Sequence, residues 1–143
     1  MKRVETIGFE IKTISNLIKR KINESPFEFN DLTGMQGWIL KYVHIQSQYS
    51  NVFQKDIEKE FKIRRSTATG ILQLLEKNGY IIRESVVEDA RLKKIVLTEK
   101  AIRAQEELTE RVEKLDNLIE SGLTNEEIET FFKIAKKIKK NLE

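Results

Sequence analysis

The chain has 143 residues, 39% of them hydrophobic and 34% charged, which is enough for one globular unit with a buried core. Its 26 basic and 23 acidic side chains nearly balance, so the net charge of +3 says little by itself about a polyanionic partner. The absence of cysteine excludes disulfides and thiolate metal sites and is typical of a cytoplasmic protein, and no apolar run approaches the length of a membrane span.

The first two helices are predicted from the spacing of apolar residues. From Val4 to Ile18 such residues recur in steps of three and four, close to the repeat of paired helices. Pro26 ends this pattern, because proline disfavours a helical residue before it. A second helix is expected from Thr33, which has the spacing of a capping box with Gln36. Its buried face is predicted to hold Met35, Trp38, Ile39, Tyr42 and Val43.

Two further helices are predicted on either side of a short turn. The first has Ile57 and Phe61 as its core contacts, residues 63–65 form the turn, and the second helix runs from Ser66 to Lys77. Gly79 ends this second helix, since glycine is the usual left-handed residue after a helix C-terminus. The inward face of the second helix is predicted to hold Ile71, Leu72, Leu74 and Leu75.

The apolar period then changes to that of β-strands. Residues 80–87 and 94–97 are two β-rich runs separated by polar residues 88–93, which predicts an antiparallel hairpin with a charged tip. Helical periodicity returns at residues 101–119, and a capping box at Thr124 opens a last helix. The flanking helices carry more apolar surface than one small core needs, which indicates a partner subunit.

The segment from Gln54 to Leu75 has the form of a helix-turn-helix, whose second helix brings its N-terminal residues to base edges in the DNA major groove. Arginine pairs with guanine, hydroxyls reach bases or phosphates, and small residues let the helix sit deep in the groove. No carboxylate occurs between Ile63 and Glu76, although the chain has 23 acidic residues. The candidate contacts read directly from this segment are Arg64, Arg65, Ser66, Thr67 and Thr69.

The hairpin tip is a second candidate DNA contact. A basic arm beside a recognition helix can reach the adjacent minor groove, where Arg91 would meet the negative potential of narrow A/T-rich DNA. Asp89 lies two residues earlier, and we expect it to fix the tip or orient the arginine rather than to touch DNA.

Three stretches of the chain, residues 65–69, 75–83 and 89–98, resemble in this order the MarR family of bacterial transcriptional regulators. The combination of Asp89-x-Arg91 with the later pair Leu97-Thr98 is fairly specific, and the resemblance extends over essentially the whole chain. It implies a mainly α fold with a small β-hairpin wing, that is, a winged helix-turn-helix flanked by dimerisation helices. The single domain of residues 1–143 would then comprise an N-terminal dimerisation helix at 1–30, the winged helix-turn-helix at 32–100 and C-terminal dimerisation helices at 101–143.

The resemblance also implies a function. Members similar to this chain are homodimers that bind a near-palindromic double-stranded DNA site, usually as repressors relieved by a small molecule. By motif position, Gln73 would join the recognition-helix residues in the major groove, Arg91 would enter the minor groove with Asp89 bracing the wing, and Lys93 and Lys94 would lie near phosphates.

The sequence departs from the family pattern at two positions. Gly70 stands where similar members often carry a basic residue, so one contact is missing or the helix sits closer to DNA. Arg64 stands where a capping Ser or Asp is common, which would weaken the start of the helix by roughly 1 kcal/mol while supplying a phosphate ligand.

Other chemistries have little support in the sequence. His44 is the only histidine and there is no cysteine, so metal sensing is disfavoured, no cofactor is indicated, and no catalytic constellation is present. An effector pocket for a small aromatic or phenolic molecule is a candidate, although aromatic residues more often belong to a core. The residues considered for it are Phe9, Trp38, Tyr42, His44 and Tyr49. The alternative to a DNA-binding regulator is a winged-helix protein-interaction module that does not bind specific DNA.

Overall fold

The computed structural model describes residues 5–24, 29, 31–32 and 34–143, which divide into two compact units. One unit holds the described residues up to 24 together with residues 111–143, and the other holds the described residues from 29 to 110. The sequence predictions that concern Val4, Pro26 and Thr33 lie outside the described residues.

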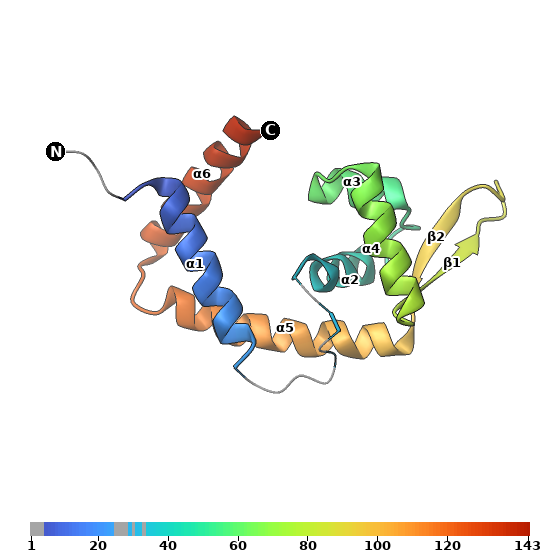
Figure 1. Cartoon of the computed structure of the whole chain (residues 1–143), viewed down its shortest axis with the longest axis horizontal. Coiled ribbons are helices and arrows are strands. Elements are labelled where there is room, and N and C mark those ends of the chain that lie inside the picture. The colour runs from blue at the N-terminus through green and yellow to red at the C-terminus, as the bar shows by residue number, and fades with distance from the viewer. Residues whose placement is uncertain (1–4, 25–28, 30, 33) are drawn as a thin grey trace. The chain divides into compact units, whose positions relative to one another are not determined.

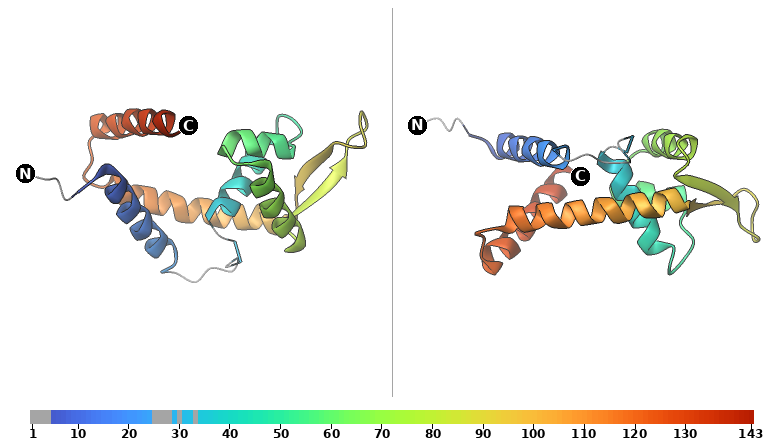
Figure 2. Two further views of the ribbon diagram at one scale, coloured as in Figure 1. Left: turned by 45° about the horizontal axis from the view of Figure 1, so that its top comes forward. Right: turned by 90° about the horizontal axis from the view of Figure 1, so that it is seen from below.

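The unit that ends at residue 110 contains three helices and a hairpin, followed by the first part of a fourth helix (Figures 1 and 2). The helices are α2 (Gly34–Gln46), α3 (Gln54–Phe61) and α4 (Arg65–Lys77), and α5 (Glu99–Glu120) begins in this unit. Strands β1 (Ile81–Ser85) and β2 (Lys93–Leu97) pair antiparallel, with Ile81 opposite Leu97. The predicted mainly α fold with a β-hairpin wing is confirmed.

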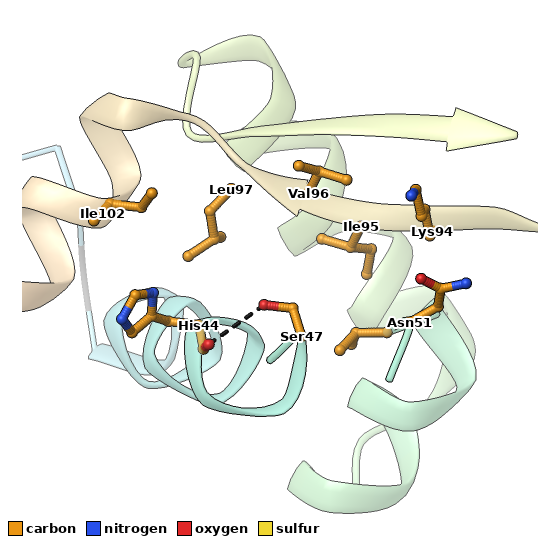
Figure 3. Close-up of a pocket in the computed structure, with 9 residues that line it drawn as sticks. His44, Ser47, Asn51, Lys94, Ile95, Val96, Leu97 and Ile102 are labelled. Carbon is orange, nitrogen blue, oxygen red and sulfur yellow. Dashed lines mark hydrogen bonds between the residues drawn. The ribbon is translucent and has the colours of Figure 1, made fainter. Parts of the chain in front are cut away.

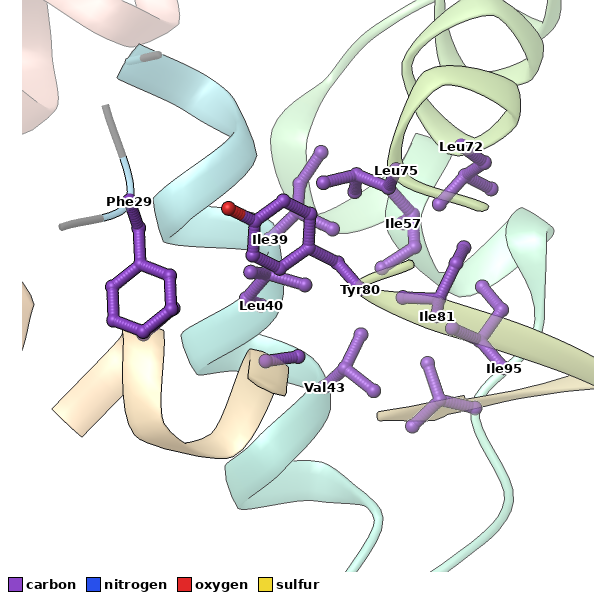
Figure 4. Close-up of a cluster of buried hydrophobic side chains, with 13 residues drawn as sticks. Phe29, Ile39, Leu40, Val43, Ile57, Leu72, Leu75, Tyr80, Ile81 and Ile95 are labelled. Atoms are coloured by element: carbon purple, nitrogen blue, oxygen red, sulfur yellow. The ribbon is translucent and has the colours of Figure 1, made fainter. Parts of the chain in front are cut away.

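The core of this unit lies where α2, α4 and the hairpin meet (Figure 4). Leu72 and Leu75 of α4 and Ile81 and Ile95 of the hairpin are all buried, because the helix and the strands each turn one apolar side inward. The backbone N–H of Ile95 also donates to the carbonyl of Val52 at 2.7 Å, which ties the hairpin to the loop before α3. The wing is thereby fixed at its base to the helices beside it.

Thr98 joins the end of the hairpin to the turn after α4. Its hydroxyl donates to the carbonyl of Gly79 at 2.7 Å, and the same oxygen accepts from the N–H of Ala101 at 3.2 Å, in the first turn of α5. Gly79 has a φ of +80°, a left-handed conformation that glycine adopts without strain, and ends α4 as predicted. The Leu97-Thr98 motif therefore has a structural role in closing the winged helix.

The other unit contains α1 (Ile7–Ile22), the last part of α5, and α6 (Asn125–Leu142). The predicted capping box of α6 is present, since the N–H of Thr124 donates to Glu127 Oε1 at 2.9 Å and the N–H of Glu127 donates to Thr124 Oγ1 at 3.1 Å. Arg111 of α5 donates to the carbonyl of Ile22 at 3.3 Å. Every residue of α1 and α6 is described, and none of them is buried.

The predicted inward face of α2 was wrong in part. Trp38 is 61% exposed and Met35 is also exposed, whereas Gln36 and Leu40, which the prediction left out, are buried. The reason is that α2 is apolar over much of its circumference, so hydrophobic spacing alone does not fix which side meets the core. Leu74 of α4 is likewise exposed, because Ala68, Leu72 and Leu75 already form its buried side.

Candidate nucleic-acid interface

The N-terminal half of α4 presents an uncapped, acid-free surface. The helix begins at Arg65, and the residue before it, Arg64, has an extended backbone and makes no side-chain capping bond in the described structure. Ala68 is buried and fixes the inner side of the helix, so the residues around it on the other side face outward. The exposed residues of this surface are Arg64, Arg65, Ser66, Thr67, Gly70 and Gln73.

Thr69 is the one predicted contact of α4 that is only half-buried rather than exposed. Its hydroxyl accepts a hydrogen bond at 2.9 Å from Nε2 of Gln54, the first residue of α3. The same nitrogen lies 3.4 Å from the carbonyl oxygen of Arg65, to which it also donates. Gln54 was not predicted as a site residue, and the only sequence signal for it was its place at the start of the helix-turn-helix.

The turn between α3 and α4 sets the angle at which the recognition helix is presented. Lys62, which follows α3, has a φ of +52°, in the left-handed region, and lets the chain reverse within a few residues. At the other end of α3, Asp56 accepts from the backbone N–H of Phe53 at 2.8 Å, which holds the start of the helix. Both ends of α3 are therefore fixed by local bonds or backbone geometry.

The tip of the wing is organised by Asp89 and Arg91. Asp89 Oδ1 accepts from the backbone N–H of Arg91 at 2.9 Å and from its Nε at 3.2 Å, and Oδ2 accepts from Nη2 at 3.1 Å. The hydrogen bond from the Arg91 side chain, and then that from its backbone, lower the pKa of the Asp89 carboxyl. The Arg91 side chain remains 90% exposed, so it is braced at the tip and still open to solvent.

The two lysines of the wing have partners on the opposite strand. Lys93 Nζ donates to Ser85 Oγ at 2.6 Å, and Lys94 Nζ lies 3.7 Å from a carboxylate oxygen of Glu84. Both pairs follow the register, in which Ser85 faces Lys93 and Glu84 faces Lys94. The Glu84 carboxylate offsets part of the Lys94 charge, so Lys93 is the stronger of the two candidates for a phosphate.

The candidate effector residues do not gather around one cavity within this unit. His44 lines a cavity of about 320 Å³ with Ser47, which follows α2, and with residues of β2 and the start of α5 (Figure 3). Trp38 and Tyr49 are exposed, and Tyr42 packs edge-on against Phe61 at 5.8 Å between ring centres. Phe9 is exposed and belongs to the other unit.

The described part of the chain offers no other binding chemistry of these kinds. No group of three or more His, Asp or Glu side chains in it is placed to hold a metal ion. None of the helices found there combines the length and apolarity needed to cross a membrane.

The comparison with known proteins places the chain in a family. Residues 30–92 match the family model described as MarR family. The HTH-type transcriptional regulator PapX of Escherichia coli is 31% identical, over 85% of this chain and 75% of its own length. The chain belongs to the MarR family. A second relative, the HTH-type regulator YybA of Bacillus subtilis strain 168, is 29% identical over 83% of the chain and 79% of its own length.

Solved structures agree with this membership of the MarR family. MepR of S. aureus in complex with DNA superposes with a TM-score of 0.84 at 28% identity, covering 96% of this chain and 97% of that one. The predictions of a MarR family member and of a DNA-binding transcriptional regulator are confirmed. The MarR family consists of transcriptional regulators rather than enzymes.

Proposed function

We propose that this MarR family protein is a cytoplasmic, homodimeric repressor that binds a near-palindromic operator and releases it when a small molecule binds. In this proposal residues 32–100 bind DNA, and residues 1–30 and 101–143 hold the dimer together. The observation that carries it is the exposed, acid-free N-terminal face of α4 beside a wing whose Arg91 is 90% exposed. The superposition on MepR in its complex with DNA supports the same assignment.

The proposed contacts follow from the chemistry of the exposed side chains. Arg64 and Arg65 suit guanine edges or phosphates, and Ser66 and Thr67 bring hydroxyls to the same groove. Arg91 is assigned to the adjacent minor groove, where its charge meets the negative potential of A/T-rich DNA. The remaining proposed contacts are Thr69, Gln73, Lys93 and Lys94, with Asp89 as the brace of the wing.

The proposal of a homodimer rests on apolar surface that one chain leaves uncovered. On α1, Ile7, Ile11 and Leu17 are each at least half exposed, and on α6, Phe131 and Phe132 are each 63% exposed. A row of large apolar side chains on two amphipathic helices marks an interface between proteins. A twofold dimer would offer two recognition helices, about 34 Å apart if they enter successive turns of the major groove.

The main alternative, a winged-helix module that binds only proteins, is less compatible with the surface of α4. The N-terminal half of α4 exposes guanidinium, hydroxyl and glycine surface rather than the aromatic and apolar anchors of a protein interface. The two functions are distinguished by whether DNA binding depends on this surface.

The test is binding to a duplex from the region upstream of the protein's own coding sequence, with excess unrelated DNA and over a salt series. We expect Arg65→Ala and Arg91→Ala each to weaken specific binding by about fivefold or more, from the loss of about 1–3 kcal/mol per base contact. Lys136→Ala, which removes an exposed charge from α6, is the matched control and should bind within about twofold of wild type.

Several outcomes would contradict this proposal. Binding by Arg65→Ala and Arg91→Ala dimers as tight as wild type would refute the assigned surface. If neither the upstream duplex nor any duplex selected from random sequences bound specifically, the protein would not be a sequence-specific DNA-binding regulator. If transcription from the promoter rose when the protein bound it, the protein would be an activator and the assignment as a repressor would be wrong.

The small-molecule part of the proposal is tested in the same assay. The cavity beside His44 has a polar and an apolar side and lies against β2, so an aromatic acid bound there would contact the base of the wing. Addition of a phenolic acid such as salicylate should weaken DNA binding in wild type and less so in His44→Ala. An affinity unchanged by a panel of aromatic acids would remove this part and leave the DNA-binding function intact.

A further inference from the structure

We infer that Gln54, by donating to the hydroxyl of Thr69, keeps the hydroxyl proton available to DNA, and thereby lets Thr69 donate to a base at one position of each half-site. This inference rests on the proposed function, since it requires α4 to enter the major groove. It assigns a specificity role to a residue of α3 that need not itself touch a base.

The first step is the orientation of the Gln54 amide. One end of this amide lies 2.9 Å from Thr69 Oγ1 and 3.4 Å from the carbonyl oxygen of Arg65. A carbonyl oxygen can only accept, so the amide end that faces it must be the NH₂ group. The NH₂ group cannot accept, and the Thr69 oxygen beside it therefore accepts as well.

The second step concerns the proton of the Thr69 hydroxyl. A hydroxyl has one proton and two lone pairs, and here the bond from Gln54 occupies one of the lone pairs. Among the described residues none accepts the Thr69 proton, so it remains available for a partner outside the chain.

The third step is the place of Thr69 on the helix. It lies four residues after Arg65 and four before Gln73, so the three side chains form one stripe along α4. Arg65 and Gln73 are both exposed on the face assigned to DNA. Thr69 therefore sits between two contacts, held from the inner side by Gln54 while its proton is free to point to the groove.

The consequence for base recognition follows from the major-groove edges. Guanine offers N7 and O6, thymine offers O4 and adenine offers N7, and all of these accept a hydrogen bond. Cytosine presents only its N4 amino group there, which donates. With its proton free, the hydroxyl can donate to the first three bases, and its remaining lone pair can accept from cytosine. A hydroxyl whose proton is turned inward presents only lone pairs to the groove and therefore opposes guanine.

The test compares wild type with two variants in selections from random-sequence duplexes, followed by affinity measurements on operators that differ at the Thr69 position. Gln54→Glu can only accept from Thr69, so it turns the hydroxyl proton inward and leaves only lone pairs for the groove. Relative to wild type, this variant should shift the preference from guanine toward cytosine by about fivefold to tenfold, the worth of one hydrogen bond. Gln54→Met has similar length and no hydrogen-bonding group, so it leaves the proton free and should keep the wild-type preference within about twofold.

Thr69→Val provides the control, because it keeps the shape of the side chain and removes the hydroxyl. In this background Gln54→Glu should no longer change the base preference, whereas a general loss of affinity from the added negative charge would remain. The inference alone would be overturned by a cytosine preference that is the same in wild type and Gln54→Glu, or by a shift that persists in the Thr69→Val background. A wild-type protein that selects no motif would instead overturn the proposed function, and the inference with it.

Discussion

The pairing of Asp89 with Arg91 shows how one carboxylate can organise an exposed arginine at the tip of the wing. Oδ1 closes a local turn by accepting from the Arg91 backbone, and the side-chain bonds hold the guanidinium at the tip. These bonds lower the pKa of the Asp89 carboxyl. The carboxylate therefore favours the ordered wing above the ordinary pKa of aspartate, and this contribution is lost as the pH falls through the lowered value.

The pH dependence of the Asp89 variants follows from this sign. Between about pH 5.5 and 8 Asp89 is fully ionised, so the ratio of DNA affinities of wild type and Asp89→Asn should stay constant. Asp89→Ala should bind more weakly than Asp89→Asn, because asparagine keeps an oxygen that accepts from the Arg91 backbone. Fluorescence anisotropy with a labelled operator measures both effects, and an affinity ratio that changes within this pH range would contradict the lowered pKa.

The side-chain bonds of Asp89 and Gln54 differ in whether they can be predicted from the sequence. Asp89 and Arg91 are two residues apart, so their bond could be predicted from local chemistry. The bond from Gln54 to Thr69 joins residues 15 positions apart and depends on how α3 crosses α4. Neither propensity nor periodicity specifies that crossing, and Gln54 was missed for this reason.

Helix α4 contains a glycine in an unusual place. Gly70 lies in the interior of the helix and is exposed, and a Cβ added there would meet no atom within 4 Å. Glycine in a helix interior is destabilising because the unfolded chain gains conformational freedom. Its place on the half of α4 that we propose to face DNA is consistent with a helix that sits close to the groove.

Gly70→Ala should stabilise the folded protein by about 0.5–1 kcal/mol, since it removes this entropic disadvantage without a clash. Gly79→Ala is the matched control, because Gly79 has a φ of +80° and alanine there should destabilise by about 1 kcal/mol or more. Urea unfolding of the two variants beside wild type measures the difference. Equal effects of the two substitutions would show that backbone conformation does not decide the outcome.

The prediction of elements from sequence was better than the prediction of their faces. The capping box at Thr124 and the glycine stop at Gly79 both come from short-range bonds or backbone conformation that residue type specifies, and both are confirmed. The inward face of α2 depends on which of several apolar sides meets the core. Trp38 was assigned to that face and is 61% exposed, because tertiary contacts rather than local pattern decide the choice.

The uncovered apolar faces of α1 and α6 predict that two chains pair through them. Ile11→Glu and Phe131→Glu would each place a charge on the proposed interface, and burial of an unpaired carboxylate is strongly unfavourable. We expect both variants to sediment as monomers at micromolar concentration and to lose specific DNA affinity by more than about a hundredfold, because each monomer holds one half-site only.

Lys133→Glu is the control for the dimer experiment. It introduces the same charge into α6 between Phe132 and Ile134, but on the side opposite Ala135 and Ile138. This variant should remain dimeric. A wild-type chain that sediments as a monomer, or a dimeric Phe131→Glu, would contradict the proposed interface.

Neither α1 nor α6 has a buried residue within one chain, so the amount of paired protein would depend on how much of the chain a cell makes. Suppose that only the dimer binds the operator. At concentrations where most chains are monomers, mass action then makes the dimer concentration rise with the square of the subunit concentration. A twofold increase in synthesis would then give about fourfold more operator-competent protein. Such a regulator would respond more steeply to its own expression level than one that reads DNA as a single chain.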